Sequence, residues 1–391
     1  MSNLTRRQDL EPYLTPEQFE FRDSVDKFLT KNSDPSMVRH WDEEKMFPAE
    51  LVQGAVEQGW FALTLPEEYG GIGDYMDMAA FLEVVGYHNL GLARFWNANV
   101  NMVGGAVSRF ASEKIKAEVL PDLAAGKCWL AFALSENGSG SDAAALRTKA
   151  DLANGEFTVN GTKMWITGAL QAKYILTAVR TDRDAKKHDG ISLVLVPNGS
   201  EGLTVSPIDL LGGHAIRTCE VNYQDVRVNE DRMVGDLHVG WKRLLTVLAK
   251  ERVALSAICV GAAQAACDLA REYAIERRQF DQSIYDFQAI SHMLVDMQTQ
   301  VDAARMMAYR AARLLVSGVP CEAEASQAKY FAADTYVRVA TDGLQIMGAN
   351  GYAMEYAMQR HYRESKLFQI FGGTNQVQRN IVARVLRKKG Q

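Results

Sequence analysis

Apolar residues recur at helical spacing at both ends of the chain and at a shorter spacing in between. Near the N-terminus, Phe21, Val25 and Phe28 fall on one face of a helix. The preceding segment Thr15-Pro16-Glu17-Gln18 supplies a capping threonine, a proline at the first helical position and the glutamine of a capping box. The pattern therefore predicts a helix that begins in this segment, and helical periodicity continues to about Lys127.

The middle of the chain, from Leu130 to Val228, has the pattern of a β domain. Short runs rich in β-forming residues recur there, as in Ile191-Ser192-Leu193-Val194-Leu195-Val196. Dipeptides that favour tight turns punctuate the runs: Asn154-Gly155, Asn160-Gly161 and Asn198-Gly199. We therefore expect tight turns at these dipeptides and an all-β middle domain.

From Trp241 to Arg387 the pattern is helical again. Ala325, Ala328 and Ala332 form a narrow stripe of small residues that suits close packing of two helices. The predicted fold class is a multidomain α+β protein. Its expected domains are an N-terminal helical domain at 1–129, a middle β-barrel-like domain at 130–239 and a C-terminal four-helix bundle at 240–391.

Composition and charge narrow the classes of function. The 391 residues are 47% hydrophobic, which suffices for substantial cores in two or three domains. The net charge is -5 and the longest basic run is Arg387-Lys388-Lys389, so we expect no nucleic-acid partner and no binding to anionic membranes. The sequence has no signal-peptide core and no stretch of about 20 apolar residues. The expected location is the cytoplasm.

Cysteines and histidines indicate neither a disulfide framework nor a metal. The five cysteines show no CxxC spacing, and an odd number cannot pair fully within one chain. Cys259 and Cys267 lie beside alanines in a helical pattern and are expected to be small buried residues. The seven histidines have no spacing typical of metal ligands, so we expect no metal site.

Glu251 is the candidate general base. Helical steps from Glu251 reach apolar residues: Leu244, Val247, Leu255 and Ile258. Burial in such a stripe would raise the pKa of the glutamate toward the working pH, as a general base requires. The alternative is an ordinary Glu-Arg pair on a helix surface.

Two further segments have the composition of a cofactor site. Leu134-Ser135-Glu136-Asn137-Gly138-Ser139-Gly140-Ser141-Asp142 is a loop whose N–H groups and hydroxyls could hold the polar edge of a cofactor, although many such loops bind nothing. In the segment Lys163-Met164-Trp165-Ile166-Thr167-Gly168, the side chains of Trp165 and Thr167 should lie on the same side of a strand. Taken alone, Trp165 is expected in the core.

Six segments, taken in order, resemble the acyl-CoA dehydrogenase family. They are Pro66-Glu67-Glu68-Tyr69-Gly70-Gly71, the loop around Ser135, the strand around Trp165, the run from Glu276 to Phe280, the run from Gln345 to Tyr352, and the run from Tyr362 to Gln376. The match extends over nearly the whole chain. This resemblance implies a homotetramer, a dimer of dimers, that binds FAD between the β domain and the C-terminal helices, with subunits sharing cofactor contacts.

The resemblance also implies roles for individual residues. Ser135 and Thr167 match residues that hydrogen-bond the flavin ring, and Trp165 matches the aromatic residue beside it. The further cofactor contacts that it implies, several of them to the FAD of a neighbouring subunit, are Ser141, Arg277, Gln279, Phe280, Gln288, Gln345, Ala349, Thr374 and Gln376. The residues that it implies beside the acyl-CoA are Ser141, Arg252, Trp96 and Phe371.

The chain departs from the family pattern at two positions. Asp281 stands where the pattern usually has glycine, which leaves the shape of that loop open. Gly372 stands where many members carry the catalytic glutamate, whereas the isovaleryl-CoA and long-chain branches resemble this chain in carrying theirs at the position of Glu251. A relocated base is therefore expected, and the backbone N–H of Gly372 would still stabilise charge on the thioester oxygen.

The implied reaction is α,β-dehydrogenation of an acyl-CoA to a trans-2-enoyl-CoA, with electrons passed to an electron-transfer flavoprotein. One alternative is an enoyl-CoA reductase that runs the reverse reaction, as in the crotonobetainyl-CoA reductase branch. Others are a flavin-dependent oxygenase or desulfinase, which an unobstructed Glu251 argues against, and a catalytically silent flavin-binding or DNA-associated relative. The sequence does not fix the direction of the reaction.

The segment Phe95-Trp96-Asn97-Ala98-Asn99-Val100-Asn101 lies where the family builds the wall of the acyl pocket. Asn97 and Asn101 would share a helix face. We expect a solvent-facing polar turn at these asparagines. The alternative is a pocket for a short or polar acyl group, capped by Trp96.

Overall fold

The N-terminal part of the chain is helical in the computed structural model, which describes residues 13–389. Its helices are α2 (Pro16–Asn32), α3 (Pro35–Glu43), α4 (Ala49–Glu57), α5 (Tyr75–His88), α6 (Leu90–Trp96), the π-helix η3 (Asn97–Gly104), α7 (Gly105–Phe110) and α8 (Glu113–Ala124). Helix α2 begins where the sequence predicts, because the Thr15 hydroxyl accepts from Gln18 N–H and the Gln18 side chain accepts from Thr15 N–H. Both bonds satisfy donors that a helix start would otherwise leave unpaired.

The middle of the chain forms a curled seven-stranded sheet. Its strands are β1 (Leu130–Ala133), β2 (Lys149–Ala153), β3 (Glu156–Thr167), β4 (Tyr174–Arg180), β5 (Ile191–Pro197), β6 (Leu203–Ile208) and β7 (Thr218–Asn229). The strand order is β1-β4-β2-β3-β7-β6, and β5 pairs with β4. Strands β1 and β4 run parallel, with Leu130 opposite Tyr174. Apolar side chains from one face form a separate core under the sheet.

One of the three expected turns is a bulge instead. Asn154-Gly155 does turn between β2 and β3, with left-handed φ angles of 53° and 77°. Asn160-Gly161, in contrast, lies inside β3, where the register with β7 shifts between Val159 and Gly161. A Cβ at Gly161 would lie 2.6 Å from the Thr148 hydroxyl, so glycine permits a close approach of two strands there.

The C-terminal part of the chain is again helical. Its elements are α9 (Gly240–Glu276), the short strands β8 (Arg278–Gln279) and β9 (Gln282–Ser283), and the helices α10 (Gln288–Val316), α11 (Glu322–Met347), α12 (Ala349–Tyr352), α13 (Ala357–Phe368) and α14 (Asn375–Lys389). The alanine stripe of α11 is buried, and α11 packs along α9, as the sequence predicts. Within residues 13–389, α9 is the one helix long and apolar enough to cross a membrane, yet 89% of its most apolar window is buried in the protein.

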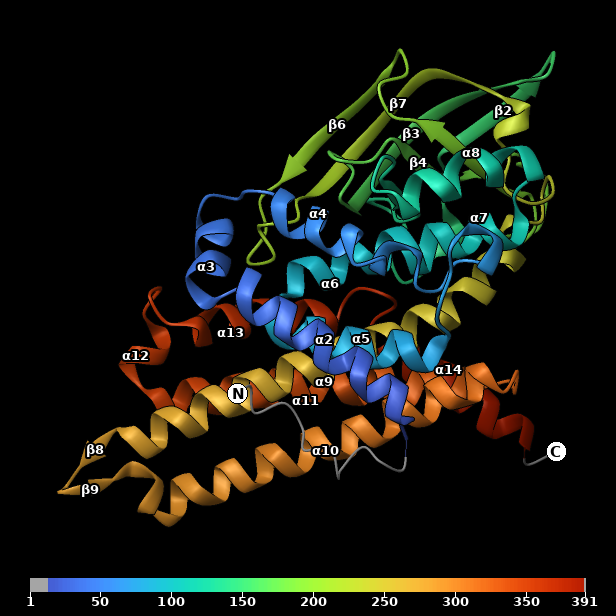
Figure 1. Cartoon of the computed structure of the whole chain (residues 1–391). Coiled ribbons are helices and arrows are strands. Elements are labelled where there is room, and N and C mark those ends of the chain that lie inside the picture. Colours follow the sequence, from blue (N-terminus) through green and yellow to red (C-terminus); the bar gives the residue numbers. More distant parts are fainter. Residues whose placement is uncertain (1–12, 390–391) are drawn as a thin grey trace.

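The three parts of the chain are stacked. Figure 1 shows the N-terminal helices between the sheet and the long C-terminal helices, and helix α9 extends from the sheet along the whole helical layer. The β8–β9 hairpin projects from the far end of α9. The start of α9 therefore adjoins all three parts, whereas its end adjoins helices and the β8–β9 hairpin.

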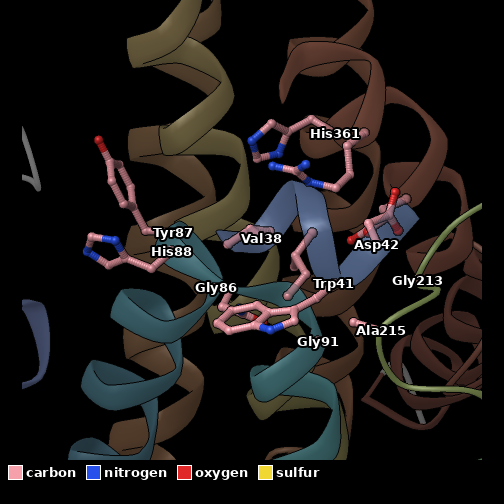
Figure 2. A pocket seen from close by; sticks show the side chains of 14 residues that line it. Val38, Trp41, Asp42, Gly86, Tyr87, His88, Gly91, Gly213, Ala215 and His361 are labelled. Atoms are coloured by element: carbon pink, nitrogen blue, oxygen red, sulfur yellow. The ribbon is translucent and has the colours of Figure 1, made fainter. Parts of the chain in front are cut away.

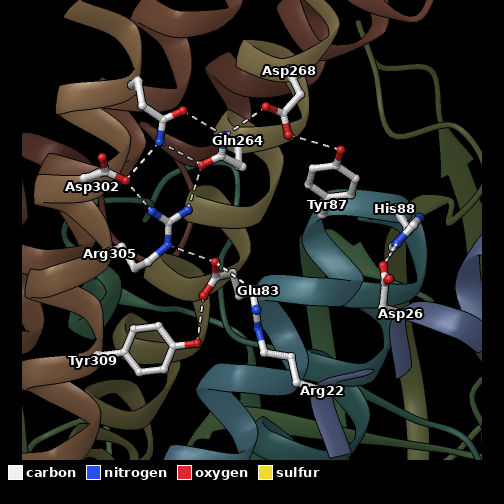
Figure 3. Close-up of polar contacts among 11 residues, drawn as sticks. Arg22, Asp26, Glu83, Tyr87, His88, Gln264, Asp268, Asp302, Arg305 and Tyr309 are labelled. Atoms are coloured by element: carbon white, nitrogen blue, oxygen red, sulfur yellow. Dashed lines mark hydrogen bonds and ion pairs between the residues drawn. The ribbon is translucent and has the colours of Figure 1, made fainter. Parts of the chain in front are cut away.

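A buried polar network joins the N-terminal and C-terminal helices (Figure 3). The Glu83 carboxylate of α5 accepts hydrogen bonds from Arg22 of α2 at 3.1 Å, from Arg305 of α10 at 3.0 Å and from Tyr309 of α10 at 2.7 Å. Burial by itself would raise the pKa of Glu83, but attraction to the two guanidinium groups outweighs it and lowers the pKa. The network holds α5 in one orientation against the long helices.

Candidate active site

Gly372 and Glu251 face each other although 121 positions separate them in the sequence. Gly372 follows α13 in a turn with Gly373, and the φ angles of the two residues are 63° and 80°. A Cβ atom at Gly372 would lie 3.6 Å from Glu251 Oε1 on α9. It would also overlap Leu255 Cδ1, so a larger residue at position 372 requires Leu255 to move. A glutamate at either position would thus bring its carboxylate to the same small region.

Glu251 is buried, with 8% of its surface exposed. Leu244, Val247 and Leu255 on the same helix are buried with it. Within residues 13–389 its carboxylate has no hydrogen bond and no ion pair. Burial raises the pKa of Glu251 to about 7, against the opposing attraction of Arg252 and Lys329. The alternative of a Glu-Arg pair on a helix surface is therefore wrong.

Two side chains form hydrogen bonds with the backbone carbonyls of the Gly372-Gly373 turn. Lys329 of α11 donates from Nζ to the Gly373 carbonyl at 2.8 Å and to Asn375 Oδ1 at 3.2 Å. Gln378 of α14 donates from Nε2 to the Gly372 carbonyl at 2.9 Å. With both carbonyls bonded on this side, the turn is fixed in one conformation.

Lys329 was not among the residues that the sequence indicated. It is buried among the alanines of α11, and burial lowers its pKa to about 8. The sequence does mark Lys329 as unusual, because it is a charged residue on the small-residue face of the helix. It lies four positions after Ala325 and three before Ala332. A lysine on a buried stripe needs partners, and here they are the Gly373 carbonyl and Asn375.

The loop after β1 is anchored through Glu136. Its carboxylate accepts from Arg147 N–H at 2.7 Å, from Thr148 N–H at 2.8 Å and from Lys163 Nζ at 2.8 Å. The Ser135 carbonyl accepts from Met164 N–H at 2.9 Å, which brings Ser135 beside the strand that carries Trp165. The loop is thus fixed at its base, while Ser141 near its tip is exposed.

Trp165 is not a core residue, contrary to the expectation for the residue taken alone. Its side chain is 52% exposed. It sits in a second bulge of β3, where the register with β7 shifts between Lys163 and Ile166 and Trp165 has a φ of 68°. A tryptophan in left-handed backbone is strained, and such strain is found chiefly at functional positions. Thr167, two positions on, is half-buried.

These residues fit a bound flavin and thioester. A flat apolar ring beside Trp165 would cover an indole that is now half-exposed. Within residues 13–389, the Ser139 hydroxyl in the adjacent loop and Arg252 Nε next to Glu251 are buried without a hydrogen-bond partner. Buried polar atoms normally have a partner, so each of the two is a candidate contact for a polar ligand.

The dinucleotide-binding candidates at the β8–β9 hairpin lie far from Glu251. Arg277 follows Glu251 by 26 residues of α9, about 39 Å at 1.5 Å per residue. Phe280 is 88% exposed at the tip of the hairpin, and Gln279 is exposed beside it. The fold therefore does not bring Arg277 or the hairpin to the Glu251 site of the same chain. The other candidates of this set, also exposed, are Gln288 at the start of α10, Gln345 in α11 and Ala349 at the start of α12.

The hairpin tip keeps the conformation that glycine would favour. Phe280 and Asp281 both have left-handed φ angles, 51° and 63°. These are the signs required at both central residues of a tight hairpin turn. Asp281, which stands in place of the usual glycine, thus adopts the glycine-like backbone at some cost in strain, and Arg278 donates to its carbonyl at 2.6 Å.

The remaining candidates near Gly372 have mixed positions. Phe371 is half-buried and packs edge-on against Phe368 at 5.1 Å between ring centroids. The Thr374 hydroxyl accepts from Val377 N–H at the start of α14. The Gln376 side chain in the first turn of α14 is exposed. Phe371 thus precedes the Gly372 turn on its α13 side, whereas Thr374 and Gln376 follow the turn.

Two expectations for the acyl pocket are wrong. Trp96 does not cap a pocket, because its indole is fully buried in the N-terminal core and donates to the Trp60 carbonyl at 2.7 Å. Asn97 and Asn101 do not form a solvent-facing turn, because both are buried in the π-helix η3. Asn101 donates to Asn97 Oδ1 at 2.8 Å, as their shared face predicts. Asn101 also lines a cavity beside the start of α9.

A second cavity, near α13, is too small for a substrate. Figure 2 shows it between Trp41, Gly86 and His361. Its volume is about 50 Å³, which is room for only a few water molecules. Burial lowers the pKa of His361 to about 3, so its ring is neutral at physiological pH. This cavity lies apart from the Glu251 region and belongs to the packing of α13.

Comparison with known proteins identifies all three parts of the chain. Residues 15–127 match the N-terminal domain of acyl-CoA dehydrogenases, residues 131–226 the middle domain and residues 238–387 the C-terminal domain. The chain is 37% identical to a probable acyl-CoA dehydrogenase, YngJ, of Bacillus subtilis (strain 168), over 96% of this chain and 99% of that one.

Two further relatives bear on the reaction. The structure of butyryl-CoA dehydrogenase from Megasphaera elsdenii is similar with a TM-score of 0.92 and 32% identity, covering 95% of this chain and 98% of that one. A 3-(aryl)acrylate reductase of Clostridium sporogenes (strain ATCC 15579) is 34% identical over 89% of this chain and 92% of its own length.

Proposed function

Because the chain belongs to the acyl-CoA dehydrogenase family, FAD-dependent oxidoreductases that act on the CH–CH bond of an acyl-CoA, we propose that Glu251 is its catalytic base. The observation that carries this proposal is the distance of 3.6 Å between a Cβ at Gly372 and Glu251 Oε1. Many members of the family carry the catalytic glutamate at the position of Gly372. The buried Glu251 carboxylate occupies the region that such a side chain would enter.

In the proposed mechanism Glu251 removes the α-proton of the thioester. Its pKa of about 7 suits this role, since the group must be ionised to accept the proton and protonated afterwards. The N–H of Gly372 donates to the thioester oxygen, where negative charge develops. Lys329 and Gln378 hold the turn so that this donor is oriented before the substrate binds. FAD held by Ser135, Thr167 and Trp165 would supply the acceptor for the hydride of the β-carbon.

The proposed FAD site is shared between subunits. Ser135, Thr167 and Trp165 would hold the flavin ring of their own subunit. The exposed hairpin with Arg277, Gln279 and Phe280 would contact the FAD of a neighbour, because about 39 Å of α9 separates it from Glu251. This separation supports the homotetramer that the family resemblance implies. We propose electron-transfer flavoprotein as the electron acceptor and the cytoplasm as the location, where the five free, buried cysteines would stay reduced.

The test is anaerobic bleaching of the bound flavin by a panel of acyl-CoAs, with wild type and Glu251→Gln compared. Loss of a general base costs about 10²–10⁴-fold in rate, so we expect at least this decrease in the variant. The variant should retain flavin absorbance and bind acyl-CoA. Glu20→Gln, on the exposed face of α2, is the control and should bleach like wild type. Wild-type bleaching by Glu251→Gln would exclude Glu251 as the base.

The reductase among the relatives makes the reverse reaction the second candidate. It is tested by mixing the reduced enzyme with an enoyl-CoA and following reoxidation of the flavin. Glu251→Gln should slow both directions by a similar factor, since the same group must deliver the α-proton in reverse. Faster turnover with enoyl-CoA than with acyl-CoA, using physiological electron partners, would assign the reductase direction.

A further inference from the structure

A cavity of about 350 Å³ opens beside the start of α9, on the side of the N-terminal helices. Its polar lining comes from four separate segments: Thr64 before the first family motif, Tyr75 at the start of α5, Asn101 and Ser108 of η3 and α7 with Arg109, and Lys250 of α9. The cavity could hold a chain of several heavy atoms with a polar end. It is open to solvent at the Arg109 side, where that side chain is exposed.

Two cations face this cavity without a counter-charge. Within residues 13–389, neither Lys250 nor Arg109 forms an ion pair or a hydrogen bond with a carboxylate. The Lys250 ammonium lies 4.6 Å from the centre of the Tyr75 ring, a weaker partner than an anion. Lys250 is buried, and burial together with repulsion from Arg109 lowers its pKa to about 8. A bound anion would relieve both effects.

The cavity adjoins the turn of α9 that carries the proposed base. Lys250 and Glu251 are consecutive on α9, so their Cα atoms are about 3.8 Å apart and their side chains diverge by about 100° around the helix. The lining comes from the N-terminal helices and α9, and includes no residue of the β domain. Ser141, the candidate contact to the thioester arm of CoA, belongs to the loop after β1. An anion in the cavity is thus better placed to belong to the acyl group than to CoA.

We propose that this cavity binds the distal carboxylate of an ω-carboxyacyl-CoA, with Lys250 and Arg109 as its cationic contacts and Asn101 and Ser108 as polar neighbours. The inference rests on the proposed function, since it assumes that the α-carbon lies at Glu251. It assigns a substrate class, acyl groups that end in a negative charge. It also gives the buried Asn101 of η3 a role in keeping the end of the pocket polar.

The test compares thioesters of equal carbon count: glutaryl-CoA with pentanoyl-CoA, and adipyl-CoA with hexanoyl-CoA. For wild type, kcat/KM from flavin reduction should be higher for the carboxylated member of at least one pair. Lys250→Met or Arg109→Gln removes a cation that would pair with the carboxylate, and each should lower that preference by about 10–100-fold. Lys250→Arg retains the charge and should keep most of the preference. Lys242→Met removes an exposed charge from the same helix and is the matched control.

The outcomes separate this inference from the proposed function. If wild type reduces its flavin with pentanoyl-CoA or hexanoyl-CoA and shows no preference for a carboxylate, the cavity assignment is wrong while the dehydrogenase assignment stands. If no acyl-CoA reduces the flavin, the proposed function fails first. Thioesters of 3′-dephospho-CoA, which lack the 3′-phosphate, test CoA as the other source of an anion. If Lys250→Met and Arg109→Gln alter the preference for CoA over 3′-dephospho-CoA, and leave the preference for a carboxylated acyl group unchanged, the cavity binds CoA. That result would overturn the inference.

Discussion

At the scale of single residues, the active site depends on an ionisable group held in an unfavourable environment. Glu251 lies in apolar surroundings, and within residues 13–389 nothing hydrogen-bonds its carboxylate. Ionising it in the folded protein therefore costs free energy that the unfolded chain does not require. This cost makes the group a stronger base near neutral pH, at the expense of stability.

The cost predicts a pH-dependent effect of Glu251→Gln on stability. The pKa is raised from 4.5 to about 7, so the folded protein binds more protons than the unfolded chain between these values. Wild type should thus lose stability as pH rises from about 4.5 to 7, by up to about 3 kcal/mol. Relative to wild type, Glu251→Gln should gain thermal stability from pH 5 to pH 8 in FAD-loaded protein without substrate. A difference that is constant with pH would contradict the raised pKa.

The second prediction at this scale concerns moving the base back to position 372. Glu251→Gly combined with Gly372→Glu should regain part of the flavin reduction that Glu251→Gly loses, because both positions direct a carboxylate to one region. The gain should be partial, since the left-handed φ of 63° costs a non-glycine residue about 1–2 kcal/mol. Adding Leu255→Ala should increase it, because the new Cβ would otherwise overlap Leu255.

The control for this relocation is Gly373→Glu in the Glu251→Gly background. A Cβ at Gly373 would lie 2.7 Å from Gln378 Nε2, and none of its three nearest atoms belongs to Glu251. This variant should show no recovery. If the position-372 variants bind FAD and a substrate analogue but reduce flavin no faster than Glu251→Gly alone, the two positions do not share a proton and the relocated base is wrong.

At the scale of elements, helix α9 connects the chemistry to the scaffold. Its middle packs against α5 and α11, and its small residues allow the close approach of α11 that brings Lys329 under the Gly372 turn. Helix α5 is in turn tied to α2 and α10 through Glu83. We therefore expect the orientation of α9 to depend on a polar contact remote from Glu251.

Glu83→Gln tests this dependence. The substitution removes the carboxylate that pairs with the buried Arg22 and one of the two carboxylates that pair with Arg305, the other being Asp302. Breaking a buried pair in this way typically costs about 3–5 kcal/mol. We expect a clearly lower thermal unfolding midpoint, whereas Glu20→Gln on the exposed face of α2 should leave it within the error of measurement. Equal midpoints for the two variants would show that the network does not stabilise the helical layer.

At the scale of the whole molecule, about 39 Å of α9 separates Glu251 from the hairpin. Phe280 and Arg277 are exposed at the far end of α9, which is where the proposed contact to the FAD of a neighbour would be made. In a symmetric assembly each hairpin would serve the site of a neighbour. This arrangement gives a test of the shared site.

Co-expression of Glu251→Gln and Arg277→Ala subunits should restore activity that neither variant has alone. In a mixed pair, one site combines the intact Glu251 of one subunit with the intact Arg277 of the other, so activity of up to about half of wild type is expected. Differently tagged subunits allow the hybrids to be purified before flavin content and reduction are measured. Purified hybrids that remain as inactive as the parents would place Arg277 and Glu251 at the same FAD.

The sequence determined the features that depend on local spacing. Helical and strand periodicity gave the helical, β and helical parts in order, and the capping box located the start of α2. The apolar stripe around Glu251 anticipated its burial, because residues three and four apart on a helix must share a face. The motifs indicated the family because each of them is a continuous segment that can be recognised in the sequence without the fold.

Only the tertiary structure decided the features made by residues distant in sequence. Lys329 lies under Gly373, and Lys250 faces Arg109, through helix packing that no local pattern encodes. The bulge that exposes Trp165 arises from the register of β3 with β7. The asparagines of η3 are buried because other parts of the chain pack around η3. Periodicity specifies which residues share a face, whereas the surface that covers a face is specified by contacts across the whole chain.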